Sequence, residues 1–274
     1  MSVRVAVVQM TSGQDLAANL AMAGELLVDA ARQGARLAVL PENFAFMGKR
    51  DQDLLTLREG PEDGPLQDFL RQVARRYGIW LVGGTIPLLA RDASKLRAAC
   101  LVFDDRGRRV ARYDKLHLFD VMLVDADEEY NESSAIQPGD HTLVVETPFG
   151  NIGVAICYDL RFPELFRAML SQQPHIIAIP SAFTAATGRA HWEPLLRARA
   201  IENLSFVVAA AQGGFHVSGR ETWGHSMIVD PWGVILAELP NGAGHVTAEL
   251  DIGLMRTTRK NFPSLEHRRF HCQL

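Results

Sequence analysis

The stretch 153–164 reads Gly-Val-Ala-Ile-Cys-Tyr-Asp-Leu-Arg-Phe-Pro-Glu and leads from an apolar run into a sequence typical of a helix start. The apolar run predicts a buried strand, and Pro163 followed by Glu164 is typical of a first helical turn. Cys157 therefore stands at a strand-to-helix turn, where its thiol can meet a substrate and backbone N–H groups. We expect the helix N-terminus to stabilise a thiolate and to lower the thiol pKa below about 8.5.

The rest of the chain alternates between predicted strands and helices. Apolar periodicity predicts helices at 15–33, 65–77, 163–172 and 190–203, and strands at 3–9, 36–40, 79–84, 97–103, 108–114, 142–146, 151–156, 175–180, 205–210, 223–229, 234–238 and 244–250. Residues 120–140 are acidic and irregular, and predict a long loop that can act as a lid. Hairpins and separate helices favour an α/β fold in which two packed sheets carry helices outside.

The bulk composition is that of an ordinary globular protein. The chain has 274 residues, of which 47% are hydrophobic and 22% charged. No linker divides it, so we expect one domain over 1–274, with a core at about 3–252 and a tail at 253–274. A net charge of −4 without a basic stripe gives no indication of a nucleic-acid partner.

The predicted location is the cytoplasm. The N-terminus reads as a strand rather than a signal peptide, and no apolar stretch approaches the ~20 residues of a membrane span. Three widely spaced cysteines, Cys100, Cys157 and Cys272, do not form a disulfide framework and favour a reducing compartment. Cys100 and Cys272 have structural or incidental interpretations.

Two further residues give Cys157 a chemical context. Glu42 follows a proline at the end of an apolar strand, and Lys115 follows another predicted strand. Separately, these would be a solvated glutamate, a surface lysine and a buried cysteine. Together, a carboxylate can take the thiol proton and an ammonium can stabilise an oxyanion, because all three residues follow strands and can meet at one face.

Other parts of the sequence are open to two interpretations. Glu132, in the acidic loop, is either a solvated charge or part of the site. The helix over 191–203 is either a surface helix or a wall of the site or subunit interface. The run 37–44 resembles 176–183, which is either a chance similarity of two apolar strands or a sign of two similar half-sheets that present loops to one site. A papain-like pair of Cys157 with His191 or His225 remains an alternative, whereas phosphate-loop, serine-elbow and zinc-protease motifs do not occur.

The segments around Glu42, Lys115 and Cys157 resemble, in order and local sequence, the nitrilase or carbon–nitrogen hydrolase superfamily. The stretch 157–164 is highly specific for its amidase branches, and the resemblance runs from 5–9 to 267–269. Further matching segments are 180–183, 191–193, 197–202 and 224–233. Together they look most like the Nit subgroup, whose members act as deaminated glutathione amidases.

This resemblance implies a four-layer α-β-β-α sandwich that forms a homodimer or higher homo-oligomer and works without metal or cofactor. By matching motif, Glu42 is the base, Lys115 the oxyanion stabiliser and Cys157 the nucleophile. Glu132 matches a second glutamate that positions substrate or lysine, and the Tyr158 N–H completes the oxyanion hole.

The resemblance also implies a small-molecule amide as substrate. The matching segments add the candidate substrate-binding residues Arg161, Ser181, Phe183, His191 and Trp192, and basic side chains such as Arg161 and Arg189 can meet substrate carboxylates. Deaminated glutathione is the first expectation. Short ω-amides of dicarboxylates, N-carbamoyl compounds and, from another class, a catalytically silent scaffold that binds a metabolite or partner remain alternatives.

Overall fold

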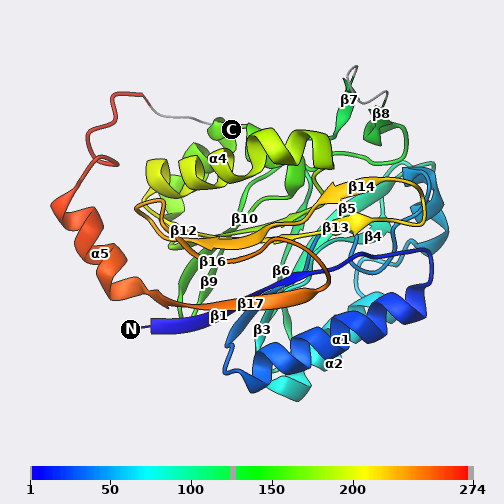
Figure 1. The fold of residues 1–274 in the computed structure, drawn as a ribbon, viewed down its shortest axis with the longest axis horizontal. Coiled ribbons are helices and arrows are strands. Elements are labelled where there is room, and N and C mark those ends of the chain that lie inside the picture. The colour runs from blue at the N-terminus through cyan, green and yellow to red at the C-terminus, as the bar shows by residue number, and fades with distance from the viewer. Residues whose placement is uncertain (1, 124–127, 271–274) are drawn as a thin grey trace.

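The computed structural model describes residues 2–123 and 128–270, in which two β-sheets lie face to face (Figure 1). In the first sheet the strand order is β17 (Gly244–Asp251), β1 (Ser2–Gln9), β2 (Leu37–Val39), β3 (Trp80–Val82), β5 (Leu96–Phe103) and β4 (Ile86–Leu89), and β6 (Arg109–Asp114) also pairs with β5. β1, β2 and β3 run parallel. Ser2 pairs with Asp251, so the first and last strands are neighbours, which fits the single domain predicted.

The second sheet has the order β16 (Ile235–Leu239), β15 (Ser226–Val229), β12 (Phe206–Ala211), β11 (Ile176–Ser181), β10 (Gly150–Val154) and β9 (Leu143–Thr147). Its central strands β10, β11 and β12 are parallel, as in the first sheet. A short hairpin of β13 (Gly213–Phe215) and β14 (Glu221–Trp223) extends beyond β12.

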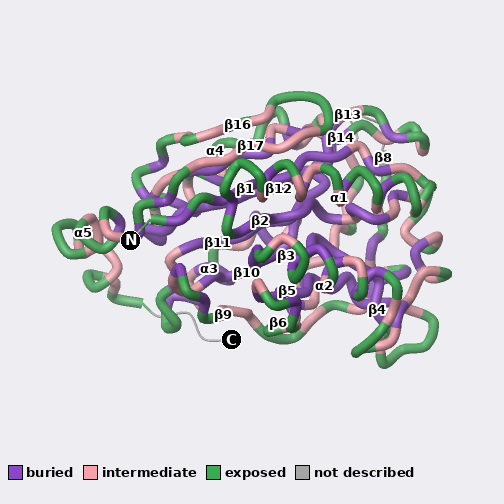
Figure 2. Tube along the Cα trace, turned by 90° about the horizontal axis from the view of Figure 1, so that it is seen from below, coloured by how far each residue is buried: buried purple, intermediate pink, exposed green. Residues whose placement is uncertain are grey.

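Helices cover the outer faces of both sheets. α1 (Leu16–Arg32) and α2 (Pro65–Tyr77) pack on the first, and α3 (Pro163–Met169) and α4 (Ala185–Asn203) on the second (Figure 1). Side chains of β1 alternate: Val5 and Val7 enter the core shared with the second sheet, whereas Ala6 and Val8 face α1 and α2. The strands are buried between exposed helix faces (Figure 2), so the predicted α-β-β-α sandwich is confirmed.

Several predicted segments differ in the structure. The predicted strand 223–229 divides into β14 and β15, which belong to different sheets. The predicted loop 120–140 contains a hairpin of β7 (Asp120–Leu123) and β8 (Glu128–Asn131). Because this hairpin buries neither face, its sequence lacks the alternation of apolar and polar residues that predicts a strand. The predicted tail contains α5 (Ile252–Asn261), whose first turn is capped by Asp251. α4 begins at Ala185 rather than 190, because Thr184 caps the N–H of Thr187. Residues 124–127 and Cys272 lie outside the described residues.

Among the helices of the described ranges, none combines the length and apolar character that crossing a bilayer requires.

Candidate active site

Lys115 joins the predicted acidic and basic residues into one cluster. Its Nζ donates to Glu42 Oε1 at 2.8 Å and to Glu132 Oε1 at 2.7 Å. Glu42 follows β2, Lys115 follows β6, and Glu132 follows β8 in a 3-10 turn, Glu132–Ser134. All three side chains are buried, and all three line one small cavity with Cys157. The four residues predicted as catalytic therefore meet at one place.

The ammonium of Lys115 is held charged and in a fixed position. Burial alone would lower its pKa, but the carboxylates of Glu132 and Glu42 outweigh burial and raise the pKa well above its ordinary value. Its backbone N–H donates to Ala98 O, and its own carbonyl accepts from Gly139 N. A cation fixed in this way is suited to stabilise an anion that develops nearby.

Cys157 departs from the predicted thiolate. Its side chain is buried, and burial first, followed by the negative charge of Glu42, raises the thiol pKa well above its ordinary value, although Lys115 opposes this. A 3-10 turn, Cys157–Arg161, separates it from α3, so the helix dipole does not act on the sulfur directly. The prediction of a lowered pKa was wrong. The resting thiol is protonated and needs a base.

The backbone at Cys157 has φ 48°, which is uncommon for a residue with a side chain. Asp159, fully buried, holds this turn: Oδ2 accepts from Ile156 N at 2.9 Å and from the Tyr113 hydroxyl at 2.7 Å. Its Oδ1 accepts from His117 N at 3.0 Å. Asp159 therefore ties the nucleophile turn to the segment that carries Lys115.

Glu132 has a pKa raised to about 7, because burial outweighs the attraction of Lys115. Its Oε2 also accepts from Phe119 N at 2.7 Å. With Glu42 on the other side of Lys115, one ammonium faces two carboxylates, and a proton on the pair relieves their repulsion.

Glu132 is expected to make the protein less stable as the pH rises through about 7. The ordinary pKa of this carboxyl is 4.5, so the folded state binds its proton more tightly. The resulting stabilisation is complete below the unfolded value and is lost as the pH passes the folded one. Urea unfolding between about pH 5 and about pH 8 should show a larger loss for the wild type than for Glu132→Gln. Parallel pH profiles would contradict the raised pKa.

The loop that carries Glu42 is fixed by close packing. The Glu42 carbonyl accepts from Gln212 Nε2 at 3.0 Å, and Asn43 N donates to Thr85 Oγ1 at 2.8 Å. Gly84 has φ 60°, and a Cβ there would clash with the carbonyl oxygen of Pro41 and lie 3.0 Å from Phe44. A glycine at 84 therefore permits the position of Glu42.

Gly84→Ala is expected to cost about 2–5 kcal/mol of unfolding free energy and to lower kcat, because left-handed strain of about 1–2 kcal/mol adds to a clash of about 1–3 kcal/mol. Gly78→Ala is the matched control: its φ is 62° and nothing lies within 4 Å of the added Cβ. Gly78→Ala should show the backbone strain alone and normal kcat. If the two variants lost the same unfolding free energy and the same kcat, the role assigned to Gly84 would be wrong.

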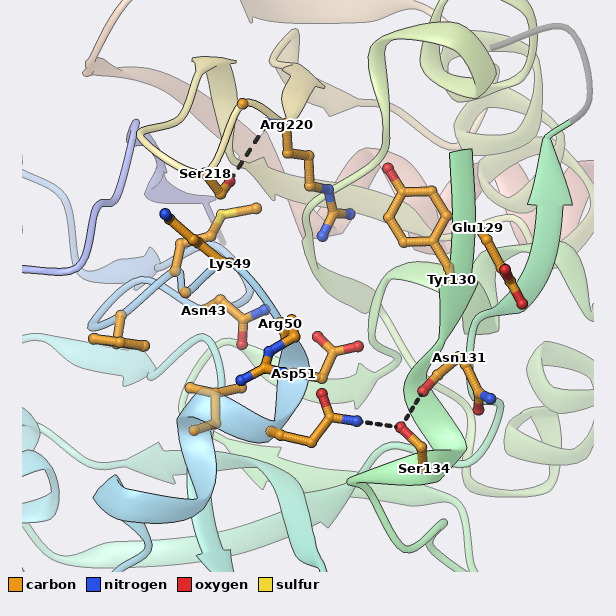
Figure 3. Close-up of a pocket in the computed structure, with 16 residues that line it drawn as sticks. Asn43, Lys49, Arg50, Asp51, Glu129, Tyr130, Asn131, Ser134, Ser218 and Arg220 are labelled. Atoms are coloured by element: carbon orange, nitrogen blue, oxygen red, sulfur yellow. Dashed lines mark hydrogen bonds between the residues drawn. The ribbon is translucent and has the colours of Figure 1, made fainter. Parts of the chain in front are cut away.

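Cys157 lines two small cavities. One, of about 20 Å³, also contains Glu42, Lys115, Glu132, Asp51 and Arg220. The other, of about 10 Å³, contains Phe119, Tyr158, Arg161 and Phe183, but neither Glu42 nor Lys115. A wide cavity of about 400 Å³ adjoins the first and shares Asn43, Asp51, Tyr130 and Arg220 with it (Figure 3).

The predicted substrate-binding residues divide into two groups. Tyr158, Arg161 and Phe183 line the second small cavity, where Arg161 lies over the rings of Tyr158 and Phe183. Ser181 ends β11 and is buried, and Trp192 is buried against Phe183. These last two support the walls of the site and do not line the cavities at Cys157.

The histidines and Arg189 lie elsewhere. His191 is exposed and its Nδ1 lies 3.1 Å from Arg161 Nη1. His225 Nδ1 lies 2.6 Å from Glu238 Oε1, and the His225 ring stacks on Trp223. The guanidinium of Arg189 from α4 also lies over the Trp223 ring. The papain-like alternative therefore has no support, because Glu42, not a histidine, shares the cavity with Cys157.

The repeated runs 37–44 and 176–183 belong to the middle strands of the two sheets. β2 leads to Glu42 and β11 leads to Phe183, and each of these residues shares a cavity with Cys157. The interpretation of two half-sheets that present loops to one site fits this geometry.

Asp51 and Arg220 are site residues that the sequence did not single out. Asp51 begins a 3-10 helix, Asp51–Leu57, and Arg220 lies between β13 and β14. Neither belongs to a motif, since each is a charged residue in a loop. Burial raises the pKa of Asp51, with Arg220 and Lys115 opposing it. Among the described residues, no cluster of three or more His, Cys, Asp or Glu has the arrangement of a metal site.

Comparisons with known proteins agree with this geometry. A family model described as carbon-nitrogen hydrolase matches residues 4–260. A protein of Yersinia enterocolitica named deaminated glutathione amidase is 43% identical over 98% of this chain and 94% of its own length. A human protein of the same name is 42% identical over 97% of this chain and 82% of its own.

A solved structure has the same fold. Saccharomyces cerevisiae Nit3, described as a member of branch 10 of the nitrilase superfamily, superposes with a TM-score of 0.88 at 32% identity. The match covers 98% of this chain and 97% of the yeast chain. The sequence comparison and the fold comparison therefore point to the same superfamily.

Proposed function

This chain belongs to the carbon–nitrogen hydrolase family and is an amidase, and on that premise we propose that it cleaves deaminated glutathione. The products are 2-oxoglutarate and cysteinylglycine. Support for the substrate comes from relatives of that name at 43% and 42% identity over nearly the whole chain. The cavity at Cys157 is small, and the adjoining cavity of about 400 Å³ supplies the room for a small-molecule amide.

We assign the chemical steps to the cluster around Lys115. Glu42 takes the proton of the Cys157 thiol while the sulfur attacks the amide carbonyl carbon. Lys115 and the backbone N–H of Tyr158 stabilise the oxyanion of the tetrahedral intermediate. Glu42 then gives its proton to the departing nitrogen, the C–N bond breaks, and a thioester remains on Cys157.

The second half of the reaction uses the same residues. Glu42 takes a proton from a water molecule, whose oxygen attacks the thioester carbonyl. The C–S bond breaks, the thiol regains a proton, and 2-oxoglutarate leaves. Glu132 keeps Lys115 in place throughout, since its Oε1 accepts from Nζ at 2.7 Å.

One observation carries this proposal: Lys115 lies between Glu42 and Glu132, in a single cavity with Cys157. The two carboxylates, the thiol and the ammonium supply a base, a nucleophile and an oxyanion donor in one buried cluster. A catalytically silent scaffold has no need for such an arrangement.

The test is intact mass spectrometry after rapid mixing with deaminated glutathione, together with assays of product. The chain should gain the mass of 2-oxoglutaric acid less one water, on Cys157, and release cysteinylglycine. A panel should include a short ω-amide of a dicarboxylate and an N-carbamoyl compound. Preferred turnover of either one would replace the proposed substrate, and no turnover of any amide would favour the silent scaffold.

We also propose that the chain forms a homodimer through α4 and the outer edge of the second sheet. Exposed apolar side chains gather there: Trp232 contacts Phe262 edge to face at 5.6 Å, and Ile201 of α4 adjoins Gly233. Sedimentation should give a dimer for the wild type and a smaller species for Trp232→Lys; a monomeric wild type would refute this. A thiol nucleophile that must remain reduced supports a cytoplasmic location.

A further inference from the structure

Arg220 forms no salt bridge in the described part of the chain, although its charge acts on the nearby carboxylate of Asp51. Its Nη2 donates to Ala182 O at 2.7 Å, and its guanidinium lies over the ring of Tyr130 at 5.0 Å. Its Nε is buried, and among the described residues no atom accepts from it. A half-buried guanidinium with unused donors is suited to bind a carboxylate, which accepts two hydrogen bonds from it.

Charge changes sign along the cavities that lead away from Cys157. The small cavity at Cys157 contains the carboxylates of Glu42, Glu132 and Asp51 and the cations of Lys115 and Arg220. The adjoining wide cavity adds Lys49, Arg50 and one carboxylate, Glu129, and Asp51 and Arg220 line both (Figure 3). Asp51 and Arg220 point into the wide cavity from different loops (Figure 3). A ligand there would meet an excess of carboxylates near the reacting carbon and an excess of cations farther out.

The position of Glu42 decides which half of the amide enters this cavity. Glu42 must lie within hydrogen-bond reach of the leaving nitrogen to protonate it. It lines the cavity that opens toward Arg220, and it is absent from the lining of the small cavity with Tyr158, Arg161 and Phe183. The amine half of the substrate therefore extends toward Arg220.

We propose that the wide cavity receives the dipeptide half of the amide, and that Arg220 binds its terminal carboxylate while Asp51 accepts a hydrogen bond from an N–H of the dipeptide. The inference rests on the proposed function and names its specificity residue. In the bound amide this half carries N–H donors at the scissile end and a carboxylate at the other, which complements the order of acceptors and cations along the cavity. About 400 Å³ is within the size range of small-molecule sites.

The experiment compares two amides that share one acyl half. Deaminated glutathione releases the dipeptide, whereas 2-oxoglutaramate releases ammonia. Arg220→Met should lower kcat/KM for deaminated glutathione by about 10- to 100-fold and leave 2-oxoglutaramate within about threefold, since only the dipeptide carries the lost carboxylate contact. Arg220→Lys should recover part of the loss. Arg106→Met, an exposed arginine in the β5–β6 turn, is the control and should change neither.

A modified substrate completes the test. Deaminated glutathione with a carboxamide in place of its terminal carboxylate should lose the same factor with the wild type and lose nothing further with Arg220→Met. Two results would overturn the assignment of Arg220 and leave the proposed function standing. In one, Arg220→Met loses the same kcat/KM on both amides; in the other, the carboxamide substrate loses as much kcat/KM with Arg220→Met as with the wild type. If the wild type fails to cleave deaminated glutathione, the proposed function fails, and the inference with it.

Discussion

Cys157→Ala is expected to lower kcat for deaminated glutathione by about 10⁴-fold or more, and to abolish the acyl adduct in intact mass spectrometry. The expected effect is large because no other described cysteine lies in the cavity of Glu42 and Lys115. Without the sulfur, that cluster has a base and an oxyanion donor but no group to carry the acyl half.

Cys100→Ala is the matched control, because Cys100 is also a buried thiol in the described chain. It lies in β5 opposite Tyr113 and packs in the core. Its loss should reduce stability by about 1 kcal/mol through a small cavity and leave kcat unchanged. Substantial turnover by Cys157→Ala, with its fold intact by circular dichroism, would show that another residue is the nucleophile.

Lys115→Met is expected to lower kcat by about 10²- to 10³-fold or more, because it removes the ammonium proposed to stabilise the oxyanion. It also leaves Glu42 and Glu132 buried without their shared cation. Their mutual repulsion should raise the pKa of the pair and move the rising limb of the kcat profile to higher pH.

The exposed Lys260 of α5 supplies a control for this change. Lys260→Met should keep normal kcat and a normal pH profile. A loss below about tenfold in Lys115→Met would contradict the oxyanion role, since removing one such donor typically costs about 10²-fold or more. Unfolding in urea must accompany the assay, because loss of one partner of a buried ion pair costs about 3–5 kcal/mol.

The sequence could predict that Glu42, Lys115 and Cys157 meet, because each follows a strand and the strand ends of the two packed sheets lie close together. It could not predict the state of the thiol. The pKa of Cys157 depends on burial and on the charge of Glu42, which lies far away in the chain. Local sequence near Cys157 indicated a helix N-terminus, and tertiary packing outweighed it.

Arg220 illustrates a second limit. The role proposed for it comes from its unused donors and from its place in one cavity with Asp51, with which it forms no salt bridge in the described structure, and neither feature leaves a local pattern. Ser181 and Trp192 show the reverse case. They lie in segments that match the family, yet they are buried supports rather than cavity residues. The hairpin of β7 and β8 was not predicted because its strands are rich in charged residues and bury little surface, so they lack an apolar pattern.

Asp159 makes the two sheets mechanically dependent on each other at the point of reaction. It follows β10 of the second sheet, yet it bonds Tyr113 and His117, which flank Lys115 at the end of β6 in the first. A motion that separates the two sheets must therefore either break these hydrogen bonds or move the Lys115 and Cys157 segments together. The spacing of the Cys157 sulfur and the Lys115 ammonium is therefore held by hydrogen bonds between the two sheets as well as by the packing of each sheet.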